Sequence, residues 1–167
     1  MKKILVITTG GTIAMKKDRE TGGLMPAVSG KDLAAAVPGL VHYADLDVLE
    51  FSNKPSGWMT AADMFELSKL IDRLADTDQA DGFVITHGTD TLEETAFFLE
   101  AVLKTEKPVC VTGAMRGASA LSADGPANIL AAVRTAASDD SIGKGVTVCL
   151  GCLLYTSPSP RDISGSR

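Results

Sequence analysis

Residues 81–96 read DGFVITHGTDTLEETA, and this stretch holds the pattern that decides the fold. Its first part, residues 82–86, is a short and nearly continuous apolar run, as expected for a parallel strand covered on both faces. A turn containing glycine follows, and Thr91 with Glu94 has the spacing of a capping box ahead of an apolar helical pattern. The stretch therefore predicts a buried strand, a tight turn and a helix in direct succession.

The same succession recurs along the chain. Further buried strands are expected at residues 3–8, 47–51, 108–112 and 145–150. Helices are expected at residues 31–37, after a Thr60 cap, and from the Asp124-Gly125-Pro126 opening. Strands alternating with helices favour right-handed crossovers. The sequence thus predicts an α/β fold: a three-layer, doubly wound, mainly parallel sheet.

Composition excludes several classes of function. The chain has 167 residues, of which 45% are hydrophobic and 22% charged, as in an ordinary soluble domain. The net charge is −5, and acidic and basic residues are interspersed. This pattern shows no basic patch of the kind that binds nucleic acid or an anionic membrane, and it fits a small-molecule substrate better. The three cysteines make no disulfide framework, and no segment resembles a secretory signal or a membrane span. Cytoplasmic residence is the default expectation.

Two segments depart from the repeating pattern. Residues 15–30 form a polar stretch that is long for a strand-to-helix connection, and such loops are often lids. After Leu150 the composition changes abruptly, and residues 152–162, CLLYTSPSPRD, resemble translated synthetic adapter sequence. We therefore expect a catalytic domain over residues 1–150. Residues 151–167 are expected to be a non-native tail or, as the alternative, a genuine disordered tail.

Three polar motifs follow predicted strands: TTGGT at residues 8–12, THGTDT at 86–91 and TGAMR at 112–116. Ligands of open parallel sheets bind beyond the carboxyl ends of the strands. Glycine allows close backbone approach to a ligand and leaves main-chain N–H groups free to bind an oxyanion or a carboxylate. Any one such motif is also an ordinary strand-to-helix turn, but the three together indicate a site.

The chemistry of that site can be narrowed. Neither a dinucleotide-binding fingerprint nor a phosphate-binding loop is present, and His42 and His87 have no partners at metal-ligand spacing. Hydroxyl nucleophiles remain, which need a base or proton relay and oxyanion donors. We expect Thr12 and Thr89 to face one another with Asp90 beside them, in a site that attacks a carboxamide through an acyl-enzyme. No metal and no cofactor are expected.

At these residues the chain resembles a known family. Residues 9–14, TGGTIA, resemble the first signature of the bacterial-type asparaginase/glutaminase family, and residues 81–96 are similar to its second. GAMR at 113–116 and the run at 122–128 extend the resemblance, which covers residues 2–150. It implies hydrolysis of L-asparagine to L-aspartate and ammonia without a cofactor, often with slower acceptance of L-glutamine.

The resemblance also implies roles for individual residues. Thr12 would be the acyl-forming nucleophile, and Thr89 with Asp90 the second catalytic group. Substrate would be bound by Gly11, Ser56, Gly88, Thr89, Asp90 and Ala114, with Ser56 on its α-carboxylate and Asp90 on its α-amino group. Glu93 and Glu94 read as first-turn helix carboxylates, and His87 as a residue that packs or orients rather than titrates.

Three departures from the family bear on activity. Leu24 stands where many members of the family carry an activating tyrosine. The family's relay lysine would lie just beyond residue 150, and Lys144 is not its equivalent because it precedes the strand. The family's smaller carboxyl-terminal domain completes the site of a neighbouring subunit in a homodimer or homotetramer, and we expect no counterpart of it in this chain. We therefore expect an amidohydrolase fragment with little or no activity. The alternatives are a glutaminase, the amidase component of a tRNA-dependent amidotransferase, or a non-catalytic asparagine-binding module.

Overall fold

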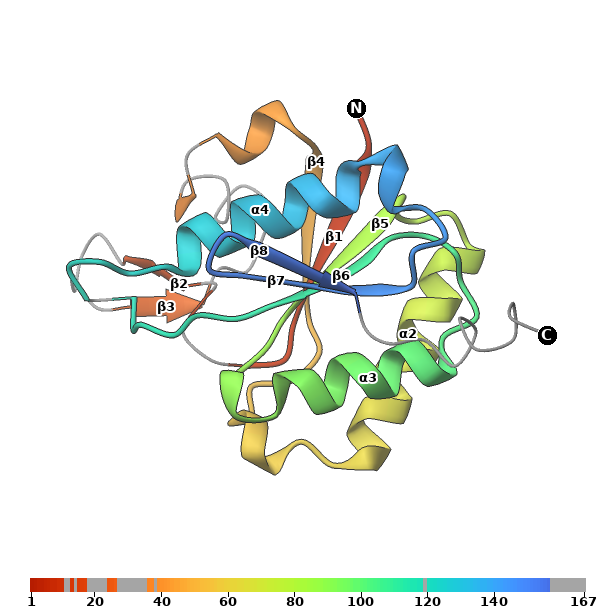
Figure 1. Cartoon of the computed structure of the whole chain (residues 1–167), viewed down its shortest axis with the longest axis horizontal. Coiled ribbons are helices and arrows are strands. Elements are labelled where there is room, and N and C mark those ends of the chain that lie inside the picture. The colour runs from red at the N-terminus through yellow and green to blue at the C-terminus, as the bar shows by residue number, and fades with distance from the viewer. Residues whose placement is uncertain are drawn as a thin grey trace.

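The computed structural model describes residues 1–10, 13, 15–17, 24–26, 36–37, 39–118 and 120–156. Its centre is a six-stranded sheet in the order β4-β1-β5-β6-β7-β8 (Figure 1). The strands are β1 (Lys3–Thr8), β4 (Asp45–Glu50), β5 (Gly82–Thr86), β6 (Val109–Thr112), β7 (Val146–Leu150) and β8 (Leu153–Thr156). The first five run parallel, and β8 pairs antiparallel with β7 at one edge. The mainly parallel α/β sheet that the sequence predicts is thereby confirmed.

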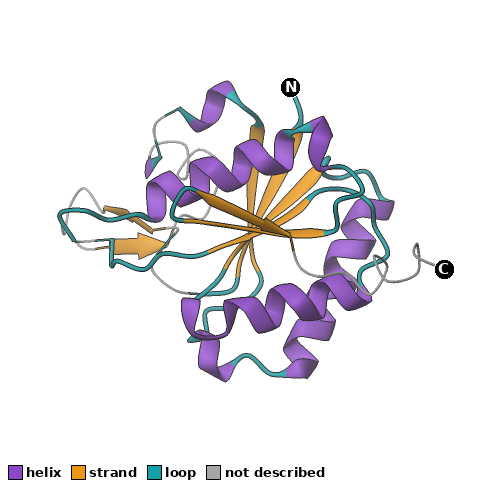
Figure 2. Cartoon of the chain, in the orientation of Figure 1, coloured by secondary structure: helices purple, strands orange, loops and turns teal. Residues whose placement is uncertain are grey.

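Helices cover both faces of this sheet (Figure 2). Helices α2 (Ala61–Asp76) and α3 (Leu92–Val102) lie on one face, and α4 (Gly125–Ala137) lies on the other. Single-turn 3₁₀ helices connect the elements at η1 (Leu40–His42), η2 (Ser56–Trp58), η3 (Thr89–Thr91) and η4 (Asp139–Ser141). No helix of the described part is long and apolar enough to cross a membrane.

The core is split into two layers because successive strand residues point to opposite faces. On β1, Leu5 and Ile7 pack with α2 and α3, whereas Ile4 and Val6 pack with α4. All four are buried, which explains why the strands read as continuous apolar runs instead of alternating ones. The two-sided core holds the carboxyl ends of the strands at one rigid edge.

Strand order places the switch point between β1 and β5. The chain passes from β1 to β4 on one side and later returns to β5 on the other. Thr8 of β1 pairs in register with Thr86 of β5, and Thr86 with Thr112 of β6. The three polar motifs therefore leave the sheet side by side at its carboxyl edge, where open α/β sheets bind ligands.

Helix starts agree with the sequence in two of three cases. Thr60 caps α2 in a reciprocal capping box with Asp63, and Asp124 precedes α4 with Pro126 in its first turn. The capping box predicted for Thr91 and Glu94 is wrong, because the Thr91 side chain makes no cap bond. The turn η3 precedes α3, and the Thr91 hydroxyl instead donates to Ser56 O at 2.9 Å.

The segment at residues 15–30 holds more regular structure than a loop. Strands β2 (Met15–Lys17) and β3 (Leu24–Pro26) form a separate antiparallel pair with Lys16 opposite Met25. The rest of this segment, and all but the end of the helix expected at residues 31–37, lie outside the described residues. The lid role of the segment stays a prediction.

Residues 151–156, which the sequence analysis left out of the fold, form a turn and strand β8. Leu153, Leu154 and Tyr155 are each about half exposed at the edge of the sheet. Residues 157–167 lie outside the described part of the chain. The division at residue 150 and the non-native origin of the tail remain predictions.

Candidate active site

Main-chain and side-chain bonds tie the three polar turns together. The Thr9 N–H and Thr9 Oγ1 both donate to Thr86 O, at 3.1 and 3.0 Å, which joins the end of β1 to the end of β5. His87 N donates to Thr112 O at 2.8 Å, which joins β5 to β6. These bonds therefore hold the described starts of the three motifs side by side.

A fourth segment, residues 52–56, packs against the end of β1. Ser52 Oγ and the Lys54 N–H donate to Thr9 O at 2.6 and 3.1 Å. Gly10 has φ of +135°, and a Cβ on it would collide with the Lys54 backbone. Only glycine allows this approach. The contact brings the serine that follows, Ser56, to the carboxyl edge of the sheet.

Ser56 lies against the turn after β5. A Cβ on Gly88 would sit 2.6 Å from Ser56 Oγ, so the glycine leaves room for the serine side chain. The Thr91 bond to Ser56 O holds the same two segments together. Ser56 is buried, and the neighbouring Asp90 is exposed. A hydroxyl and a carboxylate separated by 34 positions in the sequence thus share one edge.

Thr89 packs on the opposite side against the turn after β6. A Cβ on Gly113 would lie 3.1 Å from Thr89 Cγ2 and 2.9 Å from His87 O. Ala114 lies next in the chain and faces the start of α4, since a Cβ on Gly125 would lie 3.6 Å from Ala114 Cβ. The described contacts thus place Ser56 against Gly88 and Thr89 against Gly113, the residue that precedes Ala114.

The nucleophile predicted from the sequence, Thr12, lies outside the described residues, as does Gly11. Ile13, which follows Thr12, is buried and lies close to Gly125 at the start of α4. The contact between Thr12 and Thr89 expected from the sequence therefore stays a prediction.

A family model described as "Asparaginase, N-terminal" matches residues 3–160, nearly the whole chain. The chain belongs to the asparaginase family. This agrees with the resemblance carried by the two signature motifs.

Individual relatives agree with the family model. L-asparaginase 2-3 of Saccharomyces cerevisiae is 44% identical over 152 residues, covering 90% of this chain and 42% of the relative. The glutaminase-asparaginase of Pseudomonas aeruginosa is 40% identical over 156 residues, covering 90% and 42%. The crystal structure of a probable cytoplasmic L-asparaginase from Campylobacter jejuni is 38% identical with a TM-score of 0.82, covering 94% and 48%. The chain thus spans less than half the length of these relatives.

His87 belongs to the asparaginase signature and is fully buried. Its Nδ1 lies 2.7 Å from Gly88 O and its Nε2 lies 3.0 Å from Thr95 Oγ1. Because a carbonyl only accepts, Nδ1 carries the proton and Nε2 accepts from the Thr95 hydroxyl. Burial lowers the pKa of the imidazole, and the bond to Gly88 opposes this only in part. The geometry suits a neutral histidine that orients the turn, in line with the packing role predicted for it.

Sequence reasoning gave no role to two residues that hold the turn after β6. Asp124 Oδ2 and Oδ1 accept from the backbone N–H groups of Met115 and Arg116, both at 2.9 Å. Asn128 Nδ2 donates to Gly113 O at 2.9 Å. The run at residues 122–128 was noted only as part of the family resemblance and as a helix start. Its side-chain contacts depend on the packing of α4 against β6 and are not visible in local spacing.

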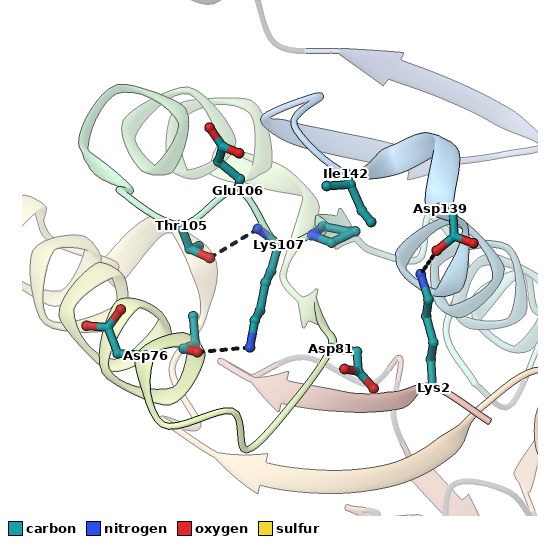
Figure 3. A pocket seen from close by; sticks show the side chains of 10 residues that line it. Lys2, Asp76, Asp81, Thr105, Glu106, Lys107, Asp139 and Ile142 are labelled. Carbon is teal, nitrogen blue, oxygen red and sulfur yellow. Dashed lines mark hydrogen bonds and ion pairs between the residues drawn. The ribbon is translucent and has the colours of Figure 1, made fainter.

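A cavity of about 470 Å³ lies at the other end of the sheet (Figure 3). Its lining includes residues just before β1, β5 and β6, namely Lys2, Asp81 and Lys107. Lys2 pairs with Asp139, and Lys107 pairs with Asp78 at 2.7 Å, so each ammonium group already has a carboxylate partner. Among the described residues no group of three potential ligands could hold a metal ion. The cavity lies at the amino ends of the strands, away from the edge where sheets of this kind bind ligands.

Proposed function

We propose that the parent protein of this chain is an amidohydrolase that converts L-asparagine and water to L-aspartate and ammonia. Family membership supports the reaction class. The observation that carries the proposal is the contact of Ser56 with Gly88 beside Thr89 at the switch point of the sheet. This contact supports the proposal because it brings the hydroxyl that we propose binds the substrate carboxylate next to the signature turn, from a distant part of the sequence.

The roles follow from the chemistry of the substrate. Ser56 would donate to the α-carboxylate, and the exposed Asp90 carboxylate would bind the α-ammonium group. Thr12 Oγ would attack the carboxamide carbon, its proton would pass to the leaving nitrogen, and ammonia would depart to leave an acyl ester. Water then hydrolyses the ester, with Thr89 and Asp90 relaying the proton. Backbone groups of Gly11, Gly88 and Ala114 would contact the substrate.

The relay is incomplete in the chain as it stands. The family resemblance places a lysine just after β7, but residues 151–167 contain no lysine. Leu24 also occupies the place of the activating tyrosine. We therefore propose that the chain binds the substrate weakly through Ser56, Thr89 and Asp90 and turns it over slowly or not at all.

Binding of the product tests this proposal in the chain itself. Titration of ¹⁵N-labelled chain with L-aspartate is expected to shift the amides of Ser56, Gly88 and Asp90, with a dissociation constant in the millimolar range, about 4 kcal/mol. Asp90→Asn is expected to weaken binding at least tenfold, because the ammonium group loses its carboxylate partner. Glu93→Gln makes the same change of charge in the first turn of α3 and is expected to bind as the unmodified chain does.

Two results would overturn the proposal: no shift at saturating L-aspartate, or equal binding by the Asp90→Asn variant. Sequencing the encoding locus past codon 150 is a second test. An in-frame lysine followed by a second domain would support the enzyme, and the tail as given would favour a non-catalytic asparagine-binding module.

A glutaminase is the second candidate, because one relative carries the name glutaminase-asparaginase. L-Glutamate differs from L-aspartate by one methylene group, which is worth about 1–3 kcal/mol in a fitted pocket. A parallel titration with L-glutamate decides the preference. Tighter binding of L-glutamate would replace asparagine with glutamine as the proposed substrate.

A further inference from the structure

Asn128 is a buried amide at the point where three segments meet. Its side chain is 3% exposed, and it lies in the first turns of α4. Nδ2 donates to Gly113 O at 2.9 Å and to Asp124 Oδ2 at 3.1 Å, while Oδ1 accepts from Gly151 N at 3.1 Å. One side chain thus joins the turn after β6, the start of α4 and the turn after β7.

The bond to Asp124 extends this junction along the loop. Asp124 accepts from the Met115 and Arg116 N–H groups, so the carboxylate holds the loop that follows Ala114. Burial alone would raise the pKa of Asp124, but the bonds from Met115, Arg116 and Asn128 outweigh it and lower the pKa. The carboxylate therefore stays ionised and keeps accepting all three donors at neutral pH.

Gly113 contacts both Asn128 and the signature turn after β5. Its carbonyl is held by Asn128, and its Cα packs so tightly against His87 O and Thr89 Cγ2 that a Cβ has no room. Close-packed interiors do not absorb such shifts. A movement of the Gly113 carbonyl would therefore displace Thr89 on one side and Ala114 on the other.

We propose that Asn128 is a positioning residue for the site, acting through Gly113 on Thr89 and Ala114 without touching the substrate. The inference rests on the proposed function, in which Thr89 and Ala114 contact the substrate. The bond to the turn after β7 uses the main-chain N–H of Gly151, whose φ of +58° lies in the left-handed region that favours glycine. Asn128 thereby couples that turn to the binding site.

Two substitutions separate the contributions of its donor and acceptor groups. Asn128→Leu removes all three bonds at similar volume. Asn128→Asp keeps the acceptor for Gly151 but loses both donors and places a second carboxylate beside Asp124. Thr147→Val is the matched control, because Thr147 is equally buried and donates one bond, to Val109 O at 3.2 Å, within the sheet.

The measurements are backbone amide shifts and the dissociation constant for L-aspartate. We expect Asn128→Leu to shift the Gly113, Ala114 and Thr89 amides and to raise the dissociation constant about tenfold. We expect Asn128→Asp to do the same at pH 7.5 and to recover part of the affinity below pH 5, where the new carboxyl is protonated and can donate one of the two lost bonds. The Thr147→Val control is expected to change neither quantity.

Unchanged Gly113 and Thr89 amides, or affinity within twofold of the unmodified chain, would overturn the proposal. If the Asn128→Leu variant does not fold, the pH dependence of Asn128→Asp decides, and a constant affinity ratio to the unmodified chain across pH counts against the proposal. Failure of the unmodified chain to bind L-aspartate overturns the proposed function instead. The amide shifts of Thr89 and Ala114 then decide the positioning role alone.

Discussion

At the scale of single residues, two threonines at the carboxyl edge of the sheet differ in whether their hydroxyl group has a hydrogen-bond partner. Thr86 and Thr112 are in register on β5 and β6, and both are fully buried. Thr112 Oγ1 donates to Cys149 O at 2.7 Å. Thr86 Oγ1 has no partner within the described part of the chain. Buried hydroxyls without partners are costly, so the two threonines should respond differently to the same substitution.

Valine has nearly the shape of threonine and removes only the hydroxyl. Thr86→Val is expected to raise the free energy of unfolding by about 1 kcal/mol, because an unsatisfied polar group leaves the interior. Thr112→Val is expected to lower it by about 1–2 kcal/mol, because Cys149 O loses a donor. Urea unfolding of the two variants measures both values. Stabilisation or destabilisation by both substitutions alike would contradict the distinction.

The buried His87 side chain should make the free energy of unfolding depend on pH. Burial lowers its pKa in the folded chain, so below the ordinary histidine pKa the unfolded chain binds a proton that the folded chain does not. The contribution of His87 to the free energy of unfolding is fully present above about pH 6.5. It decreases as the pH falls below that value, by at most about 1.4 kcal/mol per pH unit. Chemical unfolding between pH 5 and 7.5 measures the slope. A His87→Gln variant with the same slope would contradict the assignment.

At the scale of elements, the helices begin in different ways for reasons of tertiary contact. Helix α2 begins at a surface turn, where Thr60 accepts from Asp63 N at 3.2 Å and Asp63 accepts from Thr60 N at 3.0 Å. Bonds from Lys54 first, and then from Thr60, lower the pKa of Asp63 to about 2. Helix α3 begins at the candidate site, where Thr91 is engaged with Ser56 and the capping bond is absent.

The Thr60 cap should be measurable in the stability of the whole domain. Thr60→Ala is expected to lower the free energy of unfolding by about 1 kcal/mol, because the first turn of α2 loses an acceptor for a backbone N–H. Thr60→Ser retains a capping hydroxyl and is the matched control, expected to lie close to the unmodified chain. Thermal or urea unfolding checks both variants. Equal loss in the serine and alanine variants would rule out capping as the cause.

At the scale of the whole molecule, the described chain is a sheet with one core cluster on each face and the candidate site at its carboxyl edge. The proposed site draws on Ser56, Thr89 and Ala114, but the chain spans less than half the length of its relatives. We therefore expect folding and catalytic activity to be separable in this chain.

That separation leads to a prediction about activity. The purified 167-residue chain is expected to unfold cooperatively and yet to release ammonia from L-asparagine far more slowly than an ordinary enzyme, whose turnover is about 1–1000 per second. The reason is that residues 151–167 contain no lysine to complete the proposed relay, and an unactivated threonine is a poor nucleophile. An ammonia assay beside a calorimetric scan tests both halves. Turnover at an ordinary rate would show that the relay is completed by other residues.

Much of the fold could be predicted from the sequence. The apolar run at Gly82–Thr86 identifies a buried parallel strand with the bounds that the structure has, and Thr60 and Pro126 mark helix starts correctly. These features are encoded by neighbours within a few positions, where periodicity and backbone preference act. The grouping of polar turns at the carboxyl edge also follows, because parallel strands end at the same edge.

Tertiary structure alone decided which of these groups touch. The contact of Ser56 with Gly88, the use of the Thr91 hydroxyl on Ser56 instead of a helix cap, and the bonds of Asn128 to Gly113 and Gly151 join residues 15 to 35 positions apart. The turn and strand at residues 151–156 are likewise placed by pairing with β7. Local spacing carries no record of such partners. They are set by the order in which strands pair and by the packing of α4 on the sheet, and each hydroxyl or amide then bonds to whichever group that packing brings within reach.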